Sequence, residues 1–197
     1  MDIDLVNQTV AMMNPQEQVV AEQIAQPLIR EATKPRVFYG ADAIGEVVKR
    51  EGDLTPLQAS VVVEEGFVDG IYEDDAADAG IAKKNVKTAG VGQTGKYIDM
   101  SFKEAFDDKL QEAKKIFPGF DDLSLEKQEA VMSTHYRGDT RLKSGKTAKW
   151  VKLFNEGKYE KAATELLDHK EYKKRKSNNP NDGVVKRLER ASMNIAK

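Results

Sequence analysis

The feature that most restricts the fold of this chain is a run of short, β-branched and glycine-rich segments at residues 67–97, with helical patterns before and after it. Short β-branched runs between glycines are typical of a small hairpin or a three-stranded sheet. The segments after residue 101 carry the apolar spacing of helices. The sequence therefore predicts an α+β fold, with a small β lobe at about residues 66–98 and a larger helical lobe at about residues 101–197.

Start and stop signals locate the helices. Thr55 before Pro56 predicts an N-cap followed by proline at the first helical position, and Gly66 supplies the left-handed residue that ends this helix. Ser101 and Glu104 form a capping-box signature, from which a long helix should run to about Ile116. Further helices are predicted from Ser124 to His135 and at residues 148–155, 158–168 and 183–194.

Residues 1–54 are predicted to form a helical N-terminal extension of a domain at residues 55–197. Residues 16–32 have helical apolar spacing, interrupted by Pro27, and predict an amphipathic helix. A short extended piece at 36–40 and a helix at 41–50 follow. We interpret this extension as docked on the domain or as reserved for a partner.

Composition excludes several classes of chemistry. The chain has no cysteine, so disulfides, thiolate metal sites and thiol nucleophiles are absent. Its two histidines, His135 and His169, stand apart in the sequence, which argues against a zinc hydrolase and against a Ser-His-Asp enzyme. We therefore expect no metal site and no cofactor.

No segment has the composition of a membrane span or a secretory signal. A run of about 18 apolar residues is missing, and the first residues are acidic where a signal peptide would be basic and then apolar. Acidic residues outnumber basic ones over residues 1–108, and basic residues outnumber acidic ones over 109–197. A basic C-terminal half suits an anionic polymer such as cell-wall glycan, or is simply a solvated surface.

Two carboxylates, Glu65 and Asp74, precede a turn that is rich in glycine and threonine at residues 88–94. Cleavage of a sugar bond usually needs one carboxyl that stays protonated and a second that is ionised. A glutamate at a helix C-terminus, partly shielded from water, has its charged form disfavoured, so Glu65 can hold a proton near neutral pH. Asp74, on a wetter strand or turn, should remain ionised.

This pattern resembles the phage-type lysozyme family, the muramidases, in which a Glu-Gly pair at a helix end precedes a Tyr-x-Asp and then a Thr before Gly-x-Gly. The matching segments are Glu65-Gly66, Tyr72-Glu73-Asp74 and residues 88–92. Segments at 101–105, 157–163 and 183–187 resemble the family's later helices. The resemblance covers about residues 55–197 and implies a lysozyme-like fold.

The resemblance also implies roles for individual residues. Glu65 would be the general acid, Asp74 the base that activates water, and Thr88 the hydroxyl that helps to hold this water. A separation of ~6.5–9.5 Å between the two carboxyl groups would lead to inversion at the sugar's anomeric carbon, and the family resemblance implies this outcome. A separation of ~5–5.5 Å would instead indicate a retaining reaction with a covalent intermediate. The residues that would bind the substrate are Tyr72, Gly90, Gln93 and Arg137.

Three departures from the family pattern, and in addition the position of Arg137, leave alternatives open. Gln93 stands where many members have a histidine, which should change stability without loss of the mechanism. The interval from Asp74 to Thr88 is longer than usual and predicts an enlarged hairpin at residues 75–87. Arg137 either meets the glycan or its peptide, or forms a structural salt bridge. Four neighbouring acids could replace Asp74 as the base: Glu64, Glu73, Asp75 and Asp78.

Two further segments have ordinary interpretations. Residues 170–176 are mostly basic and include the aromatic residue Tyr172. We interpret this segment in the first place as the solvated edge of a loop and in the second place as a site that attracts a wall polymer. Nucleic-acid binding is the third and weakest interpretation. Trp150, Phe154 and Tyr159 recur at helical spacing and should pack in the helical lobe more readily than they stack on sugar.

The function that this resemblance implies is that of a phage-derived glycoside hydrolase, a bacteriolytic lysozyme. It would cleave the β-1,4 bond between N-acetylmuramic acid and N-acetylglucosamine in peptidoglycan. We expect it in the virion or the host cytoplasm, with glycan strands as its partner and a phage structural protein as a further partner of residues 1–54. The alternative is a lysozyme-fold structural or wall-binding virion protein that has no activity.

Overall fold

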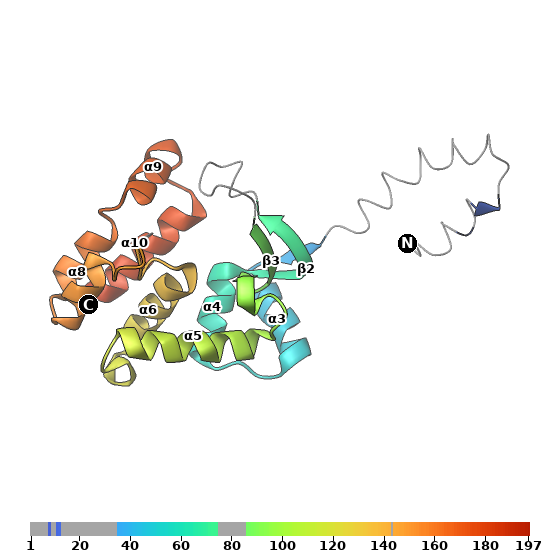
Figure 1. The fold of residues 1–197 in the computed structure, drawn as a ribbon, viewed down its shortest axis with the longest axis horizontal. Coiled ribbons are helices and arrows are strands. Elements are labelled where there is room, and N and C mark those ends of the chain that lie inside the picture. Colours follow the sequence, from blue (N-terminus) through green and yellow to red (C-terminus); the bar gives the residue numbers. More distant parts are fainter. Residues whose placement is uncertain (1–7, 9–10, 13–34, 75–85, 143) are drawn as a thin grey trace. The chain divides into compact units, whose positions relative to one another are not determined.

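The computed structural model describes residues 8, 11–12, 35–74, 86–142 and 144–197 (Figure 1). The chain divides into two compact units, Met1–Arg36 and Val37–Lys197. The amphipathic helix predicted at 16–32 lies outside the described residues. The elements described below belong to the second unit, apart from the first residue of the strand at Arg36.

The structure contains a small sheet and a larger set of helices, which confirms the α+β class. Four strands form the sheet in the order β1 (Arg36–Phe38), β2 (Phe67–Asp74), β3 (Val86–Gly90) and β4 (Gln93–Thr94). Strand β3 is antiparallel to β2 and to β4. The sheet therefore contains the predicted hairpin together with one strand from the segment that was assigned to the extension.

The register of the β2–β3 hairpin pairs Tyr72 with Thr88 and Asp74 with Val86. An irregularity in this pairing falls between Val68 and Ile71. The connection between the two strands, at residues 75–85, lies outside the described residues. The predicted enlarged hairpin is thus described in its strands, while its tip stays a prediction.

Helix α3 (Gly40–Glu51) is an integral part of the second unit, which corrects the domain boundary predicted at residue 55. Its Ala43 and Val47 side chains are buried in the common core. The Glu51 carboxylate accepts hydrogen bonds from the main-chain N–H groups of Phe102 at 2.7 Å and Lys103 at 2.8 Å. These are N–H groups of the first turn of the next long helix, which have no partner inside that helix. The compact unit therefore begins at Val37.

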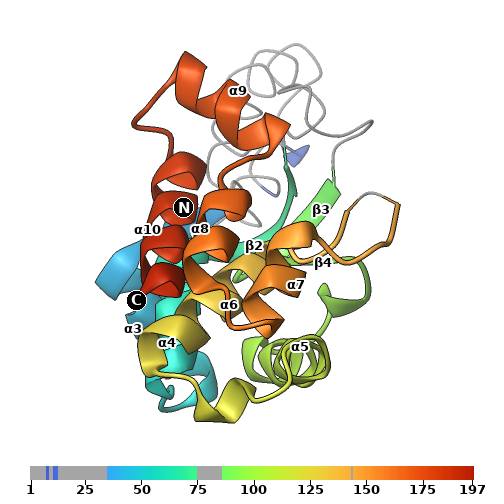
Figure 2. The ribbon, with the colours of Figure 1, turned by 90° about the vertical axis from the view of Figure 1, so that its left-hand side faces the viewer.

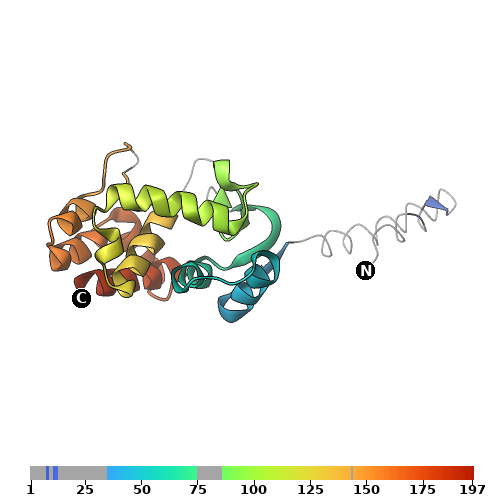
Figure 3. The ribbon, with the colours of Figure 1, turned by 90° about the horizontal axis from the view of Figure 1, so that it is seen from below.

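The predicted capping signals of two helices are confirmed. Helix α4 (Pro56–Glu65) begins after Thr55, whose side chain accepts from the N–H of Gln58 while the Gln58 side chain accepts from the N–H of Thr55. Helix α5 (Phe102–Ile116) begins after Ser101 with the same reciprocal arrangement through Glu104. In Figures 1 and 3, α5 extends from beside α3 toward the helices that follow α5 in the chain.

The remaining helices pack against one another around the C-terminal helix, α10 (Gly183–Ala196) (Figure 2). Among these helices, the segment at 170–176, predicted as a loop edge, is helical. Tyr172 is buried on this helix and its hydroxyl donates to Glu189 at 2.8 Å. The elements after α5 are η2 (Phe120–Asp122), α6 (Leu125–Arg137), α7 (Lys149–Asn155), α8 (Tyr159–Leu166), α9 (Lys170–Asn178) and α10 (Gly183–Ala196); a short 3-10 helix, η1 (Gly95–Tyr97), precedes α5.

Aromatic rings form the centre of the helical part, as predicted. The ring of Phe117 lies 5.6 Å from that of Trp150 and 5.3 Å from that of Phe154. Phe154 in turn lies 5.0 Å from Tyr159, edge to face. These rings are part of the hydrophobic core.

Within the described part of the chain, no helix is both long and apolar enough to cross a membrane.

Candidate active site

Glu65 is the last residue of α4, and a glycine fixes where this helix ends. Gly66 has φ 75° and ψ −173°, a conformation open to glycine and strained for other residues. A Cβ atom at this position would lie 2.9 Å from the Phe38 carbonyl oxygen. The backbone therefore turns sharply after Glu65 and enters β2, which confirms the predicted helix-end position of this carboxyl.

The Glu65 side chain is only 16% exposed and contacts residues from two distant parts of the chain. The Arg187 guanidinium, on α10, donates to its Oε1 at 2.7 Å. Gly92, in the turn between β3 and β4, is so close that a Cβ there would lie 3.3 Å from Glu65 Oε2. The fold thus brings the Gly-x-Gly turn of the sequence motif onto the carboxyl of Glu65.

The pKa of Glu65 is raised above the ordinary value of 4.5 because burial disfavours the charged form. Arg187 opposes this shift through its charge and its hydrogen bond, and the charges of Arg137 and Lys109 oppose it more weakly. Burial outweighs these three cations. The site therefore favours proton retention on Glu65 while holding a counter-ion against it.

Asp74 and Thr88 occupy the two strands of the hairpin. Asp74 ends β2, where its main chain pairs with Val86, and its side chain lies outside the described atoms. Thr88 is only 4% exposed and its hydroxyl donates weakly, at 3.4 Å, to the Val86 carbonyl. Tyr72 lies opposite Thr88 in the register and is half-buried. The roles of base and water-holding hydroxyl stay predictions.

Gln93 is buried, and both ends of its amide are engaged by the main chain. Its Oε1 accepts from the Val91 N–H at 2.7 Å and its Nε2 donates to the Met100 carbonyl at 2.7 Å. Gly90, at φ 52°, leaves room for this amide, because a Cβ there would lie 2.2 Å from Gln93 Oε1. The geometry therefore favours a role for Gly90 and Gln93 in holding the turn, rather than the predicted contact with substrate.

Arg137 forms the salt bridge that was one of its two predicted roles. Its Nε donates to Asp139 at 2.7 Å, and its Nη2 lies 3.3 Å from Glu171 on α9. Its side chain is 17% exposed. Because its charge still acts on the pKa of Glu65, Arg137 belongs to the electrostatic surroundings of this carboxyl as well as to the bridge.

Two residues near Glu65 were not predicted from the sequence, Lys109 and Tyr136. The Lys109 ammonium lies 4.1 Å from the centre of the Tyr136 ring and donates to the Tyr136 carbonyl at 3.1 Å. Burial lowers the pKa of Lys109, and the charge of Glu65 raises it. The Tyr136 hydroxyl is buried without a hydrogen-bond partner among the described residues, and burial raises its pKa.

The sequence contained only a partial signal for these two residues. Tyr136 directly precedes Arg137, for which contact with the glycan was one of the two predicted roles, whereas Lys109 is one of several lysines on α5 with no motif around it.

Within the described ranges, no group of three or more histidine or acidic side chains is arranged so that it could hold a metal ion. His135 is buried, with Nδ1 3.1 Å from the Thr140 hydroxyl and Nε2 3.7 Å from Glu112. Burial lowers the pKa of His135 to about 4. This histidine is therefore neutral near pH 7 and serves packing at the junction of α5 and α6.

Comparison of the chain with protein-family models, curated proteins and solved structures gave no match. The assignment of a function consequently depends on the residues of the site and on the motif resemblance.

Proposed function

We propose that the protein is a peptidoglycan hydrolase, an N-acetylmuramidase that cleaves the β-1,4 bond between N-acetylmuramic acid and N-acetylglucosamine. The observation that carries this proposal is the carboxyl of Glu65, which is mostly buried at a helix end, has a raised pKa and lies against the Gly92 turn. A general acid for glycoside cleavage needs this retention of a proton. Asp74 would activate water with inversion, and Thr88 would help to hold that water.

Clearing of a suspension of purified bacterial cell walls tests the proposal. Glu65→Gln keeps the shape of the side chain and removes the transferable proton, so the clearing rate should fall by about 10³-fold. The matched control is Glu160→Gln, which removes one exposed carboxylate from α8 and should clear at the wild-type rate. Equal clearing by wild type and Glu65→Gln would refute the mechanism.

The identity of the base needs its own pair of variants, because several acids adjoin Asp74 in the sequence. Asp74→Asn should abolish clearing while Asp75→Asn retains it. The reverse result would move the base to Asp75. The anomeric form of the first product, read by NMR, should be the inverted one; a retained product would exclude water activation by Asp74 in a single step.

One observation favours the alternative, a wall-binding or structural protein of a phage particle without activity. The 2.7 Å ion pair with Arg187 stabilises the ionised form of Glu65, and an ionised carboxyl cannot act as a general acid. This alternative predicts that the wild-type protein sediments with cell walls and releases no sugar from them. Release of reducing ends that depends on Glu65 would exclude it.

The part of the predicted extension that precedes the second compact unit, residues 1–36, bears on where such an enzyme works. A virion-carried hydrolase could use this segment to dock on a phage structural protein, whereas a free endolysin that causes host cell lysis has little use for it. We favour the virion-associated version. Detection of the protein in purified particles, and its loss from particles when residues 1–34 are deleted, would support this; particles that lack the full-length protein would refute it.

Nucleic acid is a weaker candidate partner, because much of the charge on α9 is already paired. Arg175 contacts Glu171 at 3.0 Å and Asp182 at 3.2 Å, and Lys176 contacts Glu189 at 2.8 Å. Paired cations release fewer counter-ions when they meet phosphates.

A further inference from the structure

The guanidinium of Arg137 has a nitrogen, Nη1, that no acceptor of the described residues uses. Its Nε donates to Asp139 Oδ2 at 2.7 Å and its Nη2 to Asp139 Oδ1 at 3.3 Å. The same Nη2 lies 3.3 Å from the carboxylate of Glu171 on α9. Because the charge of Arg137 acts on Glu65, this free side of the guanidinium belongs to the surroundings of the candidate acid.

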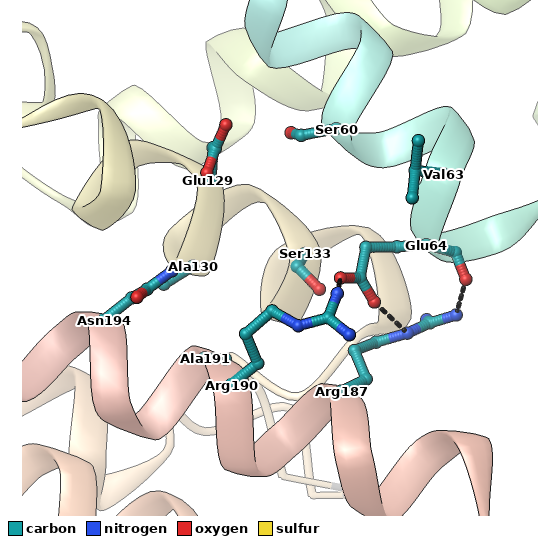
Figure 4. Close-up of a pocket in the computed structure, with 10 residues that line it drawn as sticks. All are labelled: Ser60, Val63, Glu64, Glu129, Ala130, Ser133, Arg187, Arg190, Ala191 and Asn194. Carbon is teal, nitrogen blue, oxygen red and sulfur yellow. Dashed lines mark hydrogen bonds and ion pairs between the residues drawn. The ribbon is translucent and has the colours of Figure 1, made fainter. Parts of the chain in front are cut away.

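Arg187, the other arginine whose charge acts on Glu65, has no such free side. Its Nη1 donates to Glu65 at 2.7 Å, its Nε lies 3.3 Å from the Glu64 carboxylate, and its Nη2 donates to the Glu64 carbonyl. Figure 4 shows this guanidinium beside Glu64, together with that of Arg190. Since all three nitrogens of Arg187 have partners, Arg137 is the arginine that can accept an incoming anion.

Two carboxylates contact Arg137, and the fold holds them with different firmness. Asp139 is 15% exposed, and its main chain is fixed by hydrogen bonds of 2.9 Å, one to the Thr134 carbonyl and one from the Trp150 indole. Glu171 is 36% exposed and has a single contact with this guanidinium. Ion pairs with this much solvent contact contribute little to stability. Glu171 is therefore the partner that another carboxylate can displace.

Glu171 keeps a counter-ion when it leaves Arg137. Arg175 lies one turn further along α9 and contacts the same carboxylate oxygen at 3.0 Å, closer than Arg137 does. Burial raises the pKa of Glu171, but the charges and hydrogen bonds of these two arginines outweigh burial and lower it below 4.5. Glu171 is thus ionised near neutral pH, and its departure from Arg137 leaves no carboxylate without a cation.

We propose that Glu171 is an autoinhibitory stand-in for a substrate carboxylate, and that Arg137 binds the carboxylate of an anionic sugar once Glu171 has moved away. The inference rests on the proposed function, because N-acetylmuramic acid has a lactyl carboxyl group that N-acetylglucosamine lacks. In cell walls this group carries a peptide, which has carboxylates of its own. The Nη1 and Nη2 groups then face one carboxylate in the paired geometry that arginine favours. A neutral sugar gains nothing from this contact.

Binding of N-acetylmuramic acid and N-acetylglucosamine to the full-length, isotope-labelled protein near neutral pH tests the proposal. Glu171→Gln should lower the dissociation constant of N-acetylmuramic acid by about tenfold, read from the amide NMR signals of residues 137–142 and 170–176. The dissociation constant of N-acetylglucosamine should not change. Neither sugar contains a bond for the proposed enzyme to cleave, so this result is independent of wall clearing, which tests the proposed function.

N-Acetylmuramyl dipeptide, in which a peptide occupies the lactyl carboxyl, separates the two sources of the carboxylate. A gain in affinity with this probe assigns the contact to the peptide, and a gain with N-acetylmuramic acid assigns it to the lactyl group. No gain with either probe in Glu171→Gln would overturn the proposal.

Two further variants connect the gain to Arg137. Glu165→Gln removes the same charge from α8, where Glu165 pairs with Lys149 at 2.6 Å, and should bind each probe as the wild type does. Arg137→Lys in the Glu171→Gln background keeps the positive charge but loses the fork of N–H donors, and should cancel the gain. An equal gain for N-acetylglucosamine, the same gain in Glu165→Gln, or a gain that survives Arg137→Lys would refute the assigned contact.

Discussion

Replacement of Arg187 by methionine should destabilise the protein in a way that depends on pH. Arg187 is 14% exposed, and it contacts the carboxylates of Glu64 and Glu65, which are 15% and 16% exposed. Loss of one partner from a fully buried ion pair costs about 3–5 kcal/mol. Since Arg190 still holds Glu64, and since some water reaches Glu65, we expect about 2–3 kcal/mol here.

The pH dependence follows from the raised pKa of Glu65. The folded protein holds this proton more tightly than the unfolded chain does, so stability falls as pH rises from about 4.5 through the pKa of the folded state. Removal of Arg187 raises the folded pKa further, because a counter-ion of the charged form is lost. The destabilisation by Arg187→Met should therefore be larger at alkaline pH, above the folded pKa of Glu65, than near pH 4.5.

Urea denaturation of four proteins at both pH values measures this effect: the wild type, Arg187→Met, Glu65→Gln and the double variant. The double variant should be more stable than the sum of the single effects predicts, because each single change leaves one partner unpaired. Arg190→Met is the matched control; Arg190 is 56% exposed, so its loss should cost no more than about 1 kcal/mol. Additive effects, or a loss that is equal at both pH values, would contradict the reasoning.

Two further substitutions test how the turn beside Glu65 is held. Gly66→Ala should lower the free energy of unfolding in urea by about 2–3 kcal/mol, because residue 66 has a φ of 75° and its new Cβ atom would lie 2.9 Å from the Phe38 carbonyl oxygen. The control is Gly45→Ala inside α3, where the new Cβ atom has no neighbour within 4 Å and the change should stabilise the protein. Changes of the same sign in both variants would contradict this account. Gln93→Leu should cost about 2–4 kcal/mol, because a buried N–H and the Met100 carbonyl each lose a partner. A loss within 0.5 kcal/mol, the scale of ordinary surface changes, would show that the Gln93 amide does not hold the turn.

Several parts of the fold could be predicted because their causes lie within a few residues. Thr55 with Pro56, and Ser101 with Glu104, satisfy amide groups three positions away, and the structure confirms both helix starts. Gly66 was predicted to end α4 because its lack of a Cβ permits the backbone conformation found there. These local effects also put Glu65 at a helix end.

The errors arose where distant contacts decide the structure. The segment that became α9 has no apolar periodicity, and its described contacts include one buried ring, Tyr172, and its hydrogen bond to Glu189. Helix α3 was assigned to an extension because the sequence does not reveal that Glu51 caps a helix about fifty residues later, at Phe102. Neither contact has a periodic or local signature.

By itself the sequence determined the α+β class, the main helix starts and the position of Glu65 at the end of α4, because backbone capping and glycine conformation act over a few residues. Only the tertiary structure decided the surroundings of that carboxyl. Arg187 is 122 positions away in the chain, and Gly92 and Lys109 reach Glu65 from other elements. Burial and counter-charge depend on the packing of whole elements, which a local pattern does not encode.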